Sequence, residues 1–336
     1  MPTENGFGSQ TMVGDAWTPV QASFGVPLNP QPVVPLSPPL QSQALLSGIG
    51  QLLAYLGTMA QQGVSVTQQF CQTVANFFSH QPSLPPGPVP KGPSPHDPTR
   101  FVLSSFNVLS SPAGNGKGYA PGPTRMHAVA DILRANQVSV VGLQEVEQDQ
   151  LAEFRKVAGD EYGTFAGESG LRGYHDTALA WRKDTWDLVK AATITVPSYE
   201  GRASKAPYVL LRNKQTGQEA YFIDAHNPAN TRRHHHQEGY RDAAARQEAA
   251  LAKQLREQSG LPVFIVGDMN SVREAQDIFT SGAPVKAASP RQNSGIDWIF
   301  GTKDVQFGQF RRARNSVIAR TTDHPVAFTE VTIGEK

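Results

Sequence analysis

The stretch PVFIVGDMN, residues 262–270, consists of an unbroken apolar run followed at once by polar side chains. An apolar run of this length and composition is typical of a strand that is buried on both faces. Asp268 and Asn270 follow it directly, at the edge of the sheet where α/β proteins build their sites. Asp268 could orient or deprotonate a water, and Asn270 could donate to a phosphoryl oxygen. Taken alone, however, the motif is more often an Asx turn that leads into the next helix.

Two segments upstream repeat this pattern. FVLSSFNVL (101–109) carries Asn107 at the end of its apolar run, and VSVVGLQEV (138–146) carries Glu145. A carboxylate that follows a buried strand is costly unless it is paired or binds a metal. Metal binding is the specific interpretation of Glu145, and a salt bridge or a helix N-cap is the general one. Asn107 indicates little by itself, because asparagine before a loop is common.

Two segments downstream complete the set. TTDHPVAF (321–328) places Asp323 and His324 directly before an apolar strand, and GIDWIF (295–300) places Asp297 at the start of another. A histidine needs a partner to fix its tautomer, and Asp297 is the obvious candidate for His324. His324 could be a general base or could steady phosphoryl oxygens, and Asp323 could add a metal oxygen. Together, these segments supply the carboxylates, amides and imidazole that hold a hard divalent cation and attack a phosphate ester.

Residues 99–336 contain many strand-like apolar runs with a few helical stretches between them. The run at 125–136 is amphipathic, the run at 237–258 is long, alanine-rich and charged, and a shorter helix is expected after residue 270. Many strands with a few helices over this length predict an α/β fold, in which two packed sheets are covered by helices in one domain. We expect this domain, at 99–336, to be the catalytic one.

The chain before this domain has a different character, since residues 16–90 contain no Asp, Glu, Lys or Arg. Residues 1–40 are rich in Pro, Gln and Ser and should be extended. Residues 41–80 carry an apolar stripe at helical spacing. Residues 81–98 form a proline-rich linker, which favours a stiff, extended conformation.

Three interpretations compete for residues 41–80: a helical hairpin packed on its own domain, a homo-oligomer or docking into a larger assembly, and a membrane span. The span ranks last, because glutamines interrupt the apolar run and it falls short of the roughly 20 residues required. The missing surface charge slightly favours docking over self-packing. The lone Cys71 excludes an intrachain disulfide, and no signal peptide is recognisable. These features leave the location open, and they are compatible with a cytoplasmic protein or with a component of an assembly such as a virion or envelope.

The order of the motifs, N…QE…H…GDxN…D…DH, resembles that of the endonuclease/exonuclease/phosphatase superfamily, the DNase I-like proteins, over residues 100–333. The resemblance implies a four-layer α-β-β-α sandwich with two mostly antiparallel central sheets flanked by helices. It also implies hydrolysis of a phosphoester, with Mg²⁺ or Mn²⁺ as the cofactor.

The resemblance implies a role for each motif residue as well. Glu145 would bind the metal, with support from Asn107 and Asp323. The residues that handle the attacking water and the phosphate would be Asp268 and Asn270, together with the dyad of Asp297 and His324. Sequence alone leaves open whether Asp268 or His324 is the general base.

Two further segments resemble parts of the family's site. His226 in FIDAHNPAN is similar to a family residue near the scissile phosphate. GYHDTALAWR resembles a segment in which a tyrosine and, two residues later, an acid face the site. Here these are Tyr174 and Asp176, and Asp176 would be a partner for His226. Many members have a leucine after this histidine, whereas this chain has Asn227, which could donate to a phosphate or simply shape a turn.

Two basic segments could grip successive phosphates if they flank the cleft. One follows His226 and contains Arg232 and Arg233, and the other is RRAR at 311–314, with Arg320 nearby. A solvated helix start and an exposed strand explain them about as well. Hydrolysis of nucleic-acid phosphodiesters is the leading interpretation, with nucleic acid as the partner. The alternatives are a phosphatase or phospholipase-type phosphoesterase acting on lipid or sugar phosphates, and a structural assembly component that displays the hydrolase module.

Overall fold

The residues described by the computed structural model of this protein are 97–167, 177–289 and 295–334. The expectations for residues 1–96 lie outside these ranges, so the extended segment, the docking helices and most of the linker stay predictions. Tyr174 and Asp176 also lie outside the described residues.

The first of two sheets contains the strands β1 (Thr99–Asn107), β2 (Val138–Gln144), β3 (Tyr162–Phe165), β4 (Thr177–Arg182), β11 (Gln306–Phe307), β12 (Arg311–Ala313) and β13 (Val326–Ile333). Their order is β11-β13-β1-β2-β4-β3, and β12 pairs with β13. Only β1 and β2 are parallel neighbours among these described strands. Both β1 and β2 therefore end at the same edge of the sheet.

The second sheet contains β5 (Trp186–Pro197), β6 (Ala203–Asn213), β7 (Glu219–His226), β8 (Val263–Asp268), β9 (Val285–Ala287) and β10 (Asp297–Thr302). Their order is β5-β6-β7-β8-β10-β9. Here β7 and β8 are parallel, and the other described pairs are antiparallel. Both sheets thus have one central parallel pair whose carboxyl ends present polar residues.

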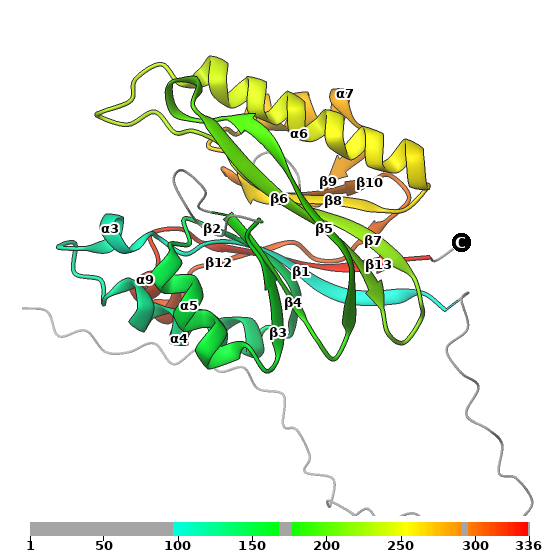
Figure 1. The fold of residues 1–336 in the computed structure, drawn as a ribbon, viewed down its shortest axis with the longest axis horizontal. Helices are drawn as coiled ribbons and strands as arrows, with labels where there is room; N and C mark the ends of the chain where they lie inside the picture. Colours follow the sequence, from blue (N-terminus) through cyan, green and yellow to red (C-terminus); the bar gives the residue numbers. More distant parts are fainter. Residues whose placement is uncertain (1–96, 168–176, 290–294, 335–336) are drawn as a thin grey trace, which may run out of the picture. The chain divides into compact units, whose positions relative to one another are not determined.

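Helices cover the outer face of each sheet (Figure 1). The first sheet is covered by α4 (Gly122–Ala135), α5 (Gln148–Ala158) and α9 (Ser316–Thr321). The second is covered by α6 (Glu238–Ser259) and α7 (Arg273–Gly282). The short helices α3 (Ser111–Gly114) and η1 (Tyr199–Gly201) lie in connecting segments. The predicted four-layer α-β-β-α sandwich is confirmed.

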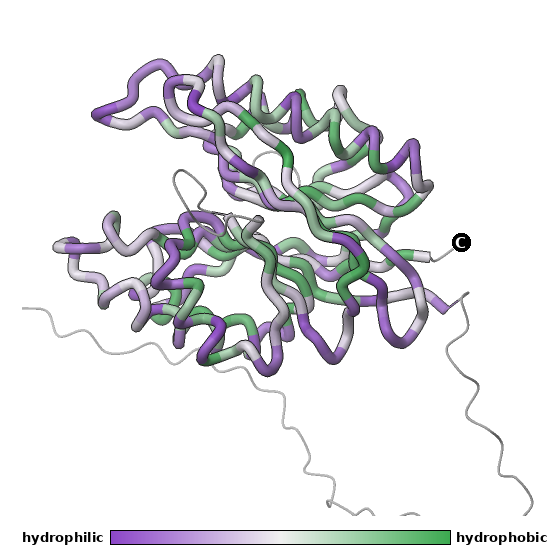
Figure 2. Tube along the Cα trace, viewed as in Figure 1, coloured by the Kyte–Doolittle hydropathy of each residue, from purple (hydrophilic) through white to green (hydrophobic). Residues whose placement is uncertain are grey.

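The two sheets face each other across an aromatic core. The Phe101 ring lies 5.2 Å from that of Trp186 and 5.7 Å from that of Phe264, both edge-on. Such contacts add to the burial of large apolar rings. Hydrophobic residues are concentrated along the central strands, and hydrophilic residues gather on loops (Figure 2). At Gly142 on β2 the sheets approach so closely that a Cβ would lie 2.4 Å from the Asp224 carboxylate of β7.

Helix α5 is the largest element that the sequence patterns did not predict. Glu147 and Gln150 form a capping box at its start, and Leu151 and Phe154 bury its apolar face against the first sheet. The run VQFGQFR at 305–311, whose apolar residues predict one strand, is divided into β11 and β12, which pair with different parts of β13.

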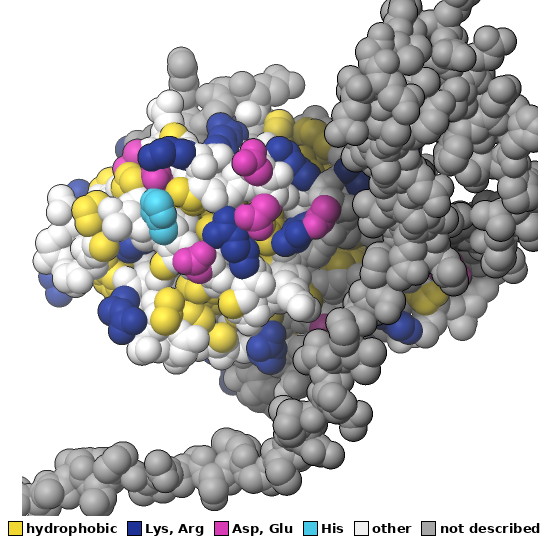
Figure 3. Space-filling view, turned by 90° about the horizontal axis from the view of Figure 1, so that it is seen from below, with side chains coloured by type: hydrophobic (Ala, Val, Ile, Leu, Met, Phe, Trp, Pro, Cys, Tyr) yellow, Lys and Arg dark blue, Asp and Glu magenta, His cyan; other side chains and the backbone are white. Residues whose placement is uncertain are grey.

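Within the described part of the chain, no helix is both long and apolar enough to cross a membrane. The face formed by α4 and α5 is seen in Figure 3, where positive and negative side chains are interspersed. Many of these charges are paired, as in Arg134 with Glu161 and Lys156 with Glu153. This helical face therefore presents no patch of a single charge sign.

Candidate active site

Asn107 and Glu145 lie at the ends of the parallel strands β1 and β2. Asn107 pairs in register with Gln144, so Glu145 comes one position beyond its strand. Asn107 Nδ2 donates to Glu145 Oε1 over 3.0 Å, and the Ser110 backbone amide donates to Glu145 Oε2 over 3.1 Å. Burial would raise the pKa of Glu145, but the charge of His226 and these two donors lower it overall. Glu145 is therefore an ionised, half-buried carboxylate.

The side chain of Asn107 is held in one orientation. Its Oδ1 accepts a hydrogen bond from the backbone amide of Leu109 at 3.0 Å, so its Nδ2 faces the site. There Nδ2 also lies 3.2 Å from Asp268 Oδ2 and 3.5 Å from His324 Nε2. Asn107 thus links Glu145 to the residues of two other segments. It supports a metal site through the carboxylate that it orients, because its own oxygen is engaged elsewhere.

Asp268 lies at the centre of the cluster. Strand register places it opposite His226 of β7 and Asp297 of β10. Its Oδ2 lies 3.9 Å from His226 Nε2 and 3.7 Å from His324 Nε2, and its Oδ1 accepts from the Asn270 backbone amide at 2.8 Å. Burial raises the pKa of Asp268 to about 6, against the lowering effect of the histidine charges. The carboxyl therefore changes its protonation state close to neutral pH, as a general base requires.

His324 forms a dyad with Asp297. Its Nδ1 lies 3.0 Å from Asp297 Oδ1, and its backbone amide donates to the Thr322 hydroxyl over 3.2 Å. Burial alone would lower the pKa of His324, but the hydrogen bond to Asp297 and the negative charges of Asp297, Asp268 and Asp323 raise it to about 9. The imidazole is therefore protonated at neutral pH, with Nε2 turned toward Asp268.

Replacing Asp297 by asparagine is expected to lower the pKa of His324 from about 9, because burial persists and the hydrogen bond and charge of Asp297 are lost, while the charges of Asp268 and Asp323 still raise it. A histidine whose pKa is raised by folding stabilises the protein fully below its unfolded value and loses this effect as pH rises through the folded value. The wild type should therefore lose stability between about pH 6.5 and pH 9, and the variant should lose less. NMR titration of the His324 ring and thermal unfolding measure both effects. A midpoint still near 9 in the variant would show that another group holds the proton.

His226 and Asn227 have different environments although they are neighbours at the end of β7. The His226 side chain is 10% exposed and reaches toward Asp268. The Asn227 side chain is buried and turned toward α6, where its Nδ2 donates to Glu248 Oε2 over 3.1 Å. Its backbone carbonyl accepts from Asn270 Nδ2 at 2.8 Å, and its backbone amide donates to the Asp268 carbonyl over 3.0 Å. Asn227 thus supports the site from behind and is not placed to contact the substrate directly.

The remaining expected residues lie around the cluster. Asp323 is exposed beside His324, and its backbone carbonyl accepts a hydrogen bond from the Arg314 guanidinium. Arg232 and Arg233 are exposed in the loop between β7 and α6. Asp323, Arg232 and Arg233 therefore do not belong to the buried cluster. They could contact a ligand only from the exposed surface around it.

Two residues of the site have a left-handed backbone. Glu145 has φ 56° and Asn270 has φ 46°. A residue other than glycine in this region costs about 1–3 kcal/mol and persists only where its surroundings fix it. Each of these residues is the first or second after a buried strand, so the turn directs its side chain back over the sheet edge.

The sequence profile of the Endonuclease/Exonuclease/phosphatase family matches residues 104–324, which include every motif that lines this edge. The chain belongs to this family. Its members are hydrolases that act on phosphoesters and generally use divalent metals. A search of the curated proteins found no match.

Solved structures of the same fold come from distant relatives. An endonuclease/exonuclease/phosphatase family protein from Bacteroides thetaiotaomicron is 17% identical, with a TM-score of 0.56, and covers 70% of this chain and 98% of its own. A mannosyl-6-phosphatase from the same organism is 18% identical, with a TM-score of 0.56 over 69% of this chain and 99% of its own. The catalytic domain of human Nocturnin, with a bound sulfate anion, is 16% identical, with a TM-score of 0.54 over 71% and 98%. At these identities the likeness establishes the fold only.

The residues of this phosphoesterase fit a divalent cation. Glu145 is ionised although half-buried, and carboxylates are the preferred ligands of hard cations. Asp268, Asp297 and His324 also lie together, each with one possible ligand atom within 4.8 Å of those of the other two. Because a protonated His324 has no lone pair to offer, the ligands would be carboxylate oxygens, which suit a hard divalent ion better than a soft one.

Sequence reasoning missed Arg125, which organises the loop that carries the Glu145 donors. Its guanidinium is buried in α4 and donates to the backbone carbonyls of Val108, Leu109, Ser110 and Thr321. A signal was available, because Arg125 falls on the apolar face of the helix, one turn before Val129. A charged residue on that face must satisfy its donors inside the protein.

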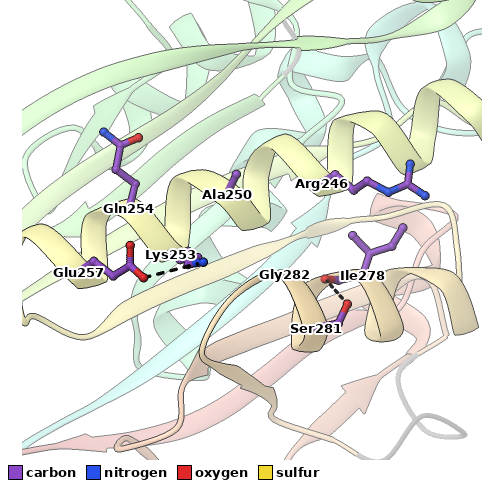
Figure 4. Close-up of a pocket in the computed structure, with 8 residues that line it drawn as sticks. All are labelled: Arg246, Ala250, Lys253, Gln254, Glu257, Ile278, Ser281 and Gly282. Carbon is purple, nitrogen blue, oxygen red and sulfur yellow. Dashed lines mark hydrogen bonds and ion pairs between the residues drawn. The ribbon is translucent and has the colours of Figure 1, made fainter.

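Two surface grooves of the described residues lie away from this site. A groove of about 440 Å³ runs between α6 and α7 and is lined by Arg246, Lys253, Ile278 and their neighbours (Figure 4). A second, of about 690 Å³, is lined by Arg100, Arg134 and Arg182 and their neighbours. Opposite charges are paired in both, as in Lys253 with Glu257 and Arg182 with Asp184. Neither groove is lined by a residue of the catalytic cluster.

Proposed function

We propose that this phosphoesterase is a Mg²⁺-dependent nuclease that hydrolyses phosphodiesters of nucleic acid. The observation that carries the proposal is a set of basic side chains on segments around the catalytic edge. They are Lys117 in the loop after α3, Arg232 and Arg233 after β7, and Arg312, Arg314 and Arg320 around β12 and α9. In Figure 1 these segments lie at one end of the molecule.

These basic side chains lack acidic partners among the described residues. In the described part of the chain none of the six forms an ion pair with a carboxylate, whereas Arg134 and Arg212 do. Two of them adjoin the catalytic dyad. Arg312 lies so close to Gly295 that a Cβ there would be 2.6 Å from its guanidinium, and Arg314 binds the carbonyl of Asp323. Unneutralised guanidinium groups of this kind suit a substrate with several phosphates.

The residues of the cluster divide the chemistry between the water and the phosphoryl group. Asp268 is ionised above pH of about 6 and accepts the proton of the attacking water. His324 is protonated, and because Asp297 holds its Nδ1, it donates through Nε2 to a phosphoryl oxygen. Asn107 orients Glu145, which would hold Mg²⁺, and the bound ion would neutralise charge on the phosphate. In this proposal Asp268 is the general base, and His324 is the hydrogen-bond donor that stabilises negative charge on the phosphoryl oxygen.

The proposal is tested by Mg²⁺-dependent nicking of supercoiled plasmid with the full-length protein. The wild type should nick the plasmid, and the double variant Asp268→Ala/His324→Ala should not. The variant Arg312→Gln/Arg314→Gln should bind DNA more weakly, and its affinity should depend less steeply on salt, by about one in the logarithmic slope for each phosphate that is no longer neutralised. Arg212→Gln, whose arginine is paired with Glu219, is the matched control and should change neither the affinity nor the slope.

Assays of the same wild-type protein on other phosphoesters distinguish between the alternative substrates. If the wild type leaves DNA and RNA intact but releases phosphate from sugar or lipid phosphates, the nuclease proposal fails and the phosphatase or phospholipase interpretation replaces it. If the double variant keeps the nicking activity, the cleavage comes from a contaminant and the proposal also fails.

A further inference from the structure

Glu248 is a buried carboxyl group for which the proposed reaction has no use. It lies on the inner face of α6 with no exposed surface, and the loop after β7 covers it. Its Oε2 accepts from Asn227 Nδ2 at 3.1 Å. An unpaired carboxylate at such a position would be costly, so the protonation state of Glu248 determines how well this part of the protein is packed.

Two polar atoms of this pair have no partner. Among the described residues, Glu248 Oε1 and Asn227 Oδ1 are buried and make no hydrogen bond. Both are acceptors when Glu248 is ionised, so they cannot satisfy each other in that state. A proton on Glu248 Oε1 changes this, because the hydroxyl can donate to Asn227 Oδ1 while Asn227 Nδ2 donates to Glu248 Oε2. One proton therefore satisfies both orphaned atoms in a cyclic acid–amide pair.

The electrostatic setting favours the protonated form. Burial raises the pKa of Glu248 to about 7, although the hydrogen bond from Asn227 and the charge of His226 each lower it. His226 is the only ionisable group that acts on Glu248 from the described elements packed around it. A carboxyl with this environment keeps its proton well above the pH at which an exposed glutamate loses it.

The pair lies directly behind three site residues. The backbone of Asn227 accepts a hydrogen bond from Asn270 Nδ2 and donates one to the Asp268 carbonyl, and Asn227 follows His226 in the chain. A rotation or displacement of Asn227 would therefore move all three. The side-chain contact with Glu248 is what fixes Asn227 against α6.

We propose that Glu248 is a positioning residue that, in its protonated form, holds Asn227 in a cyclic acid–amide pair and thereby fixes His226 and Asn270 at the catalytic edge. The effect on turnover rests on the proposed function. The pairing itself does not, and it is measured without any substrate.

The pairing predicts a specific dependence of stability on pH. A carboxyl whose pKa is raised by folding contributes most stability below its unfolded value of 4.5, and the contribution is lost as pH rises to the folded value of about 7. Glu248→Gln removes this loss, because glutamine can both donate to Asn227 and accept from it but cannot ionise. Its melting temperature should exceed that of wild type by about 5 °C or more at pH 8 and by much less at pH 5.

The test uses the full-length protein as wild type, Glu248→Gln, Glu248→Leu and the control Glu257→Gln, which changes an exposed glutamate of the same helix. Thermal unfolding from pH 5 to 8 and a ¹³C NMR titration of the Glu248 carboxyl are measured. A Glu248 midpoint near 7, together with a pH-dependent gain for Glu248→Gln but not for Glu257→Gln, supports the pair. A midpoint near 4.5, or a gain independent of pH, overturns it.

Activity then tests the positioning role. Glu248→Gln should keep kcat within about twofold of wild type, and Glu248→Leu should lower kcat by about 10²-fold with little change in KM, since misplaced groups act mainly in the transition state. If the titration supports the pair but Glu248→Leu keeps full activity, the positioning role is wrong while the pair stands. If the wild type has no activity on any phosphoester tested, the proposed function fails and the titration result is unaffected.

Discussion

The Asp268→Asn variant is expected to fold normally and to lose about 10³-fold in kcat at saturating Mg²⁺, because it lacks the group that accepts a proton from the water. Asparagine keeps the shape of the side chain, and its Oδ1 can still accept from the Asn270 backbone amide. The amide would, however, present a donor to Asn107 Nδ2 where the carboxylate presents an acceptor. Steady-state nicking rates at saturating plasmid give kcat, and thermal unfolding verifies the fold.

The pH profile of the Glu248→Gln variant, in which residue 248 cannot ionise, identifies which group is the base. If Asp268 is the base and His324 donates to the phosphoryl oxygen, activity of this variant should rise as pH passes about 6 and fall as it passes about 9. If His324 were the base instead, activity should rise through about 9, since only the neutral imidazole accepts a proton. Asp187→Asn, on the exposed strand β5, is the matched control and should leave the profile unchanged. Retention of a tenth or more of the activity by Asp268→Asn would contradict its role as the base.

The positions of the catalytic groups could be predicted because they follow strand ends. Asn107 and Glu145 terminate neighbouring parallel strands, and so do His226 and Asp268. Parallel neighbours in a sheet bring their carboxyl ends to one edge. Polar residues that follow such apolar runs can therefore be predicted to lie close together at that edge. The resemblance to the family added the packing of two such sheets, which no single run implies.

The directions of the side chains could not be predicted in the same way. Asn227 follows His226 by one residue, yet it faces α6 and the buried Glu248 instead of the cleft. Asn107 turns its nitrogen to the site because Leu109 occupies its oxygen. Both orientations depend on hydrogen-bond partners from other segments or from the local turn. The spacing of apolar residues in the sequence indicates which positions are buried, but it does not indicate which hydrogen-bond partners a polar side chain has.

Replacing Arg125 by leucine is expected to destabilise the protein by about 3–5 kcal/mol, the usual cost of breaking a buried, charged hydrogen-bonding centre by removing one partner. Leucine fills part of the space but leaves the carbonyls of Val108, Leu109 and Thr321 without their donor. Urea unfolding measures the loss. Arg155→Leu, on the exposed side of α5, is the matched control and should change the free energy of unfolding by less than about 0.5 kcal/mol.

The variant Arg125→Lys tests whether the positive charge alone or the planar shape of the guanidinium stabilises the protein. Burial already lowers the pKa of Arg125, and a lysine there would be desolvated as well while offering only three donors from one point. The planar guanidinium reaches carbonyls on both sides of the site, from the loop after β1 and from α9, which precedes His324. Arg125→Lys should therefore regain less than half of the stability lost in Arg125→Leu. Because Ser110 in the same loop donates to Glu145, both variants should also bind Mg²⁺ more weakly. Full recovery by lysine would show that the charge alone holds the two segments together.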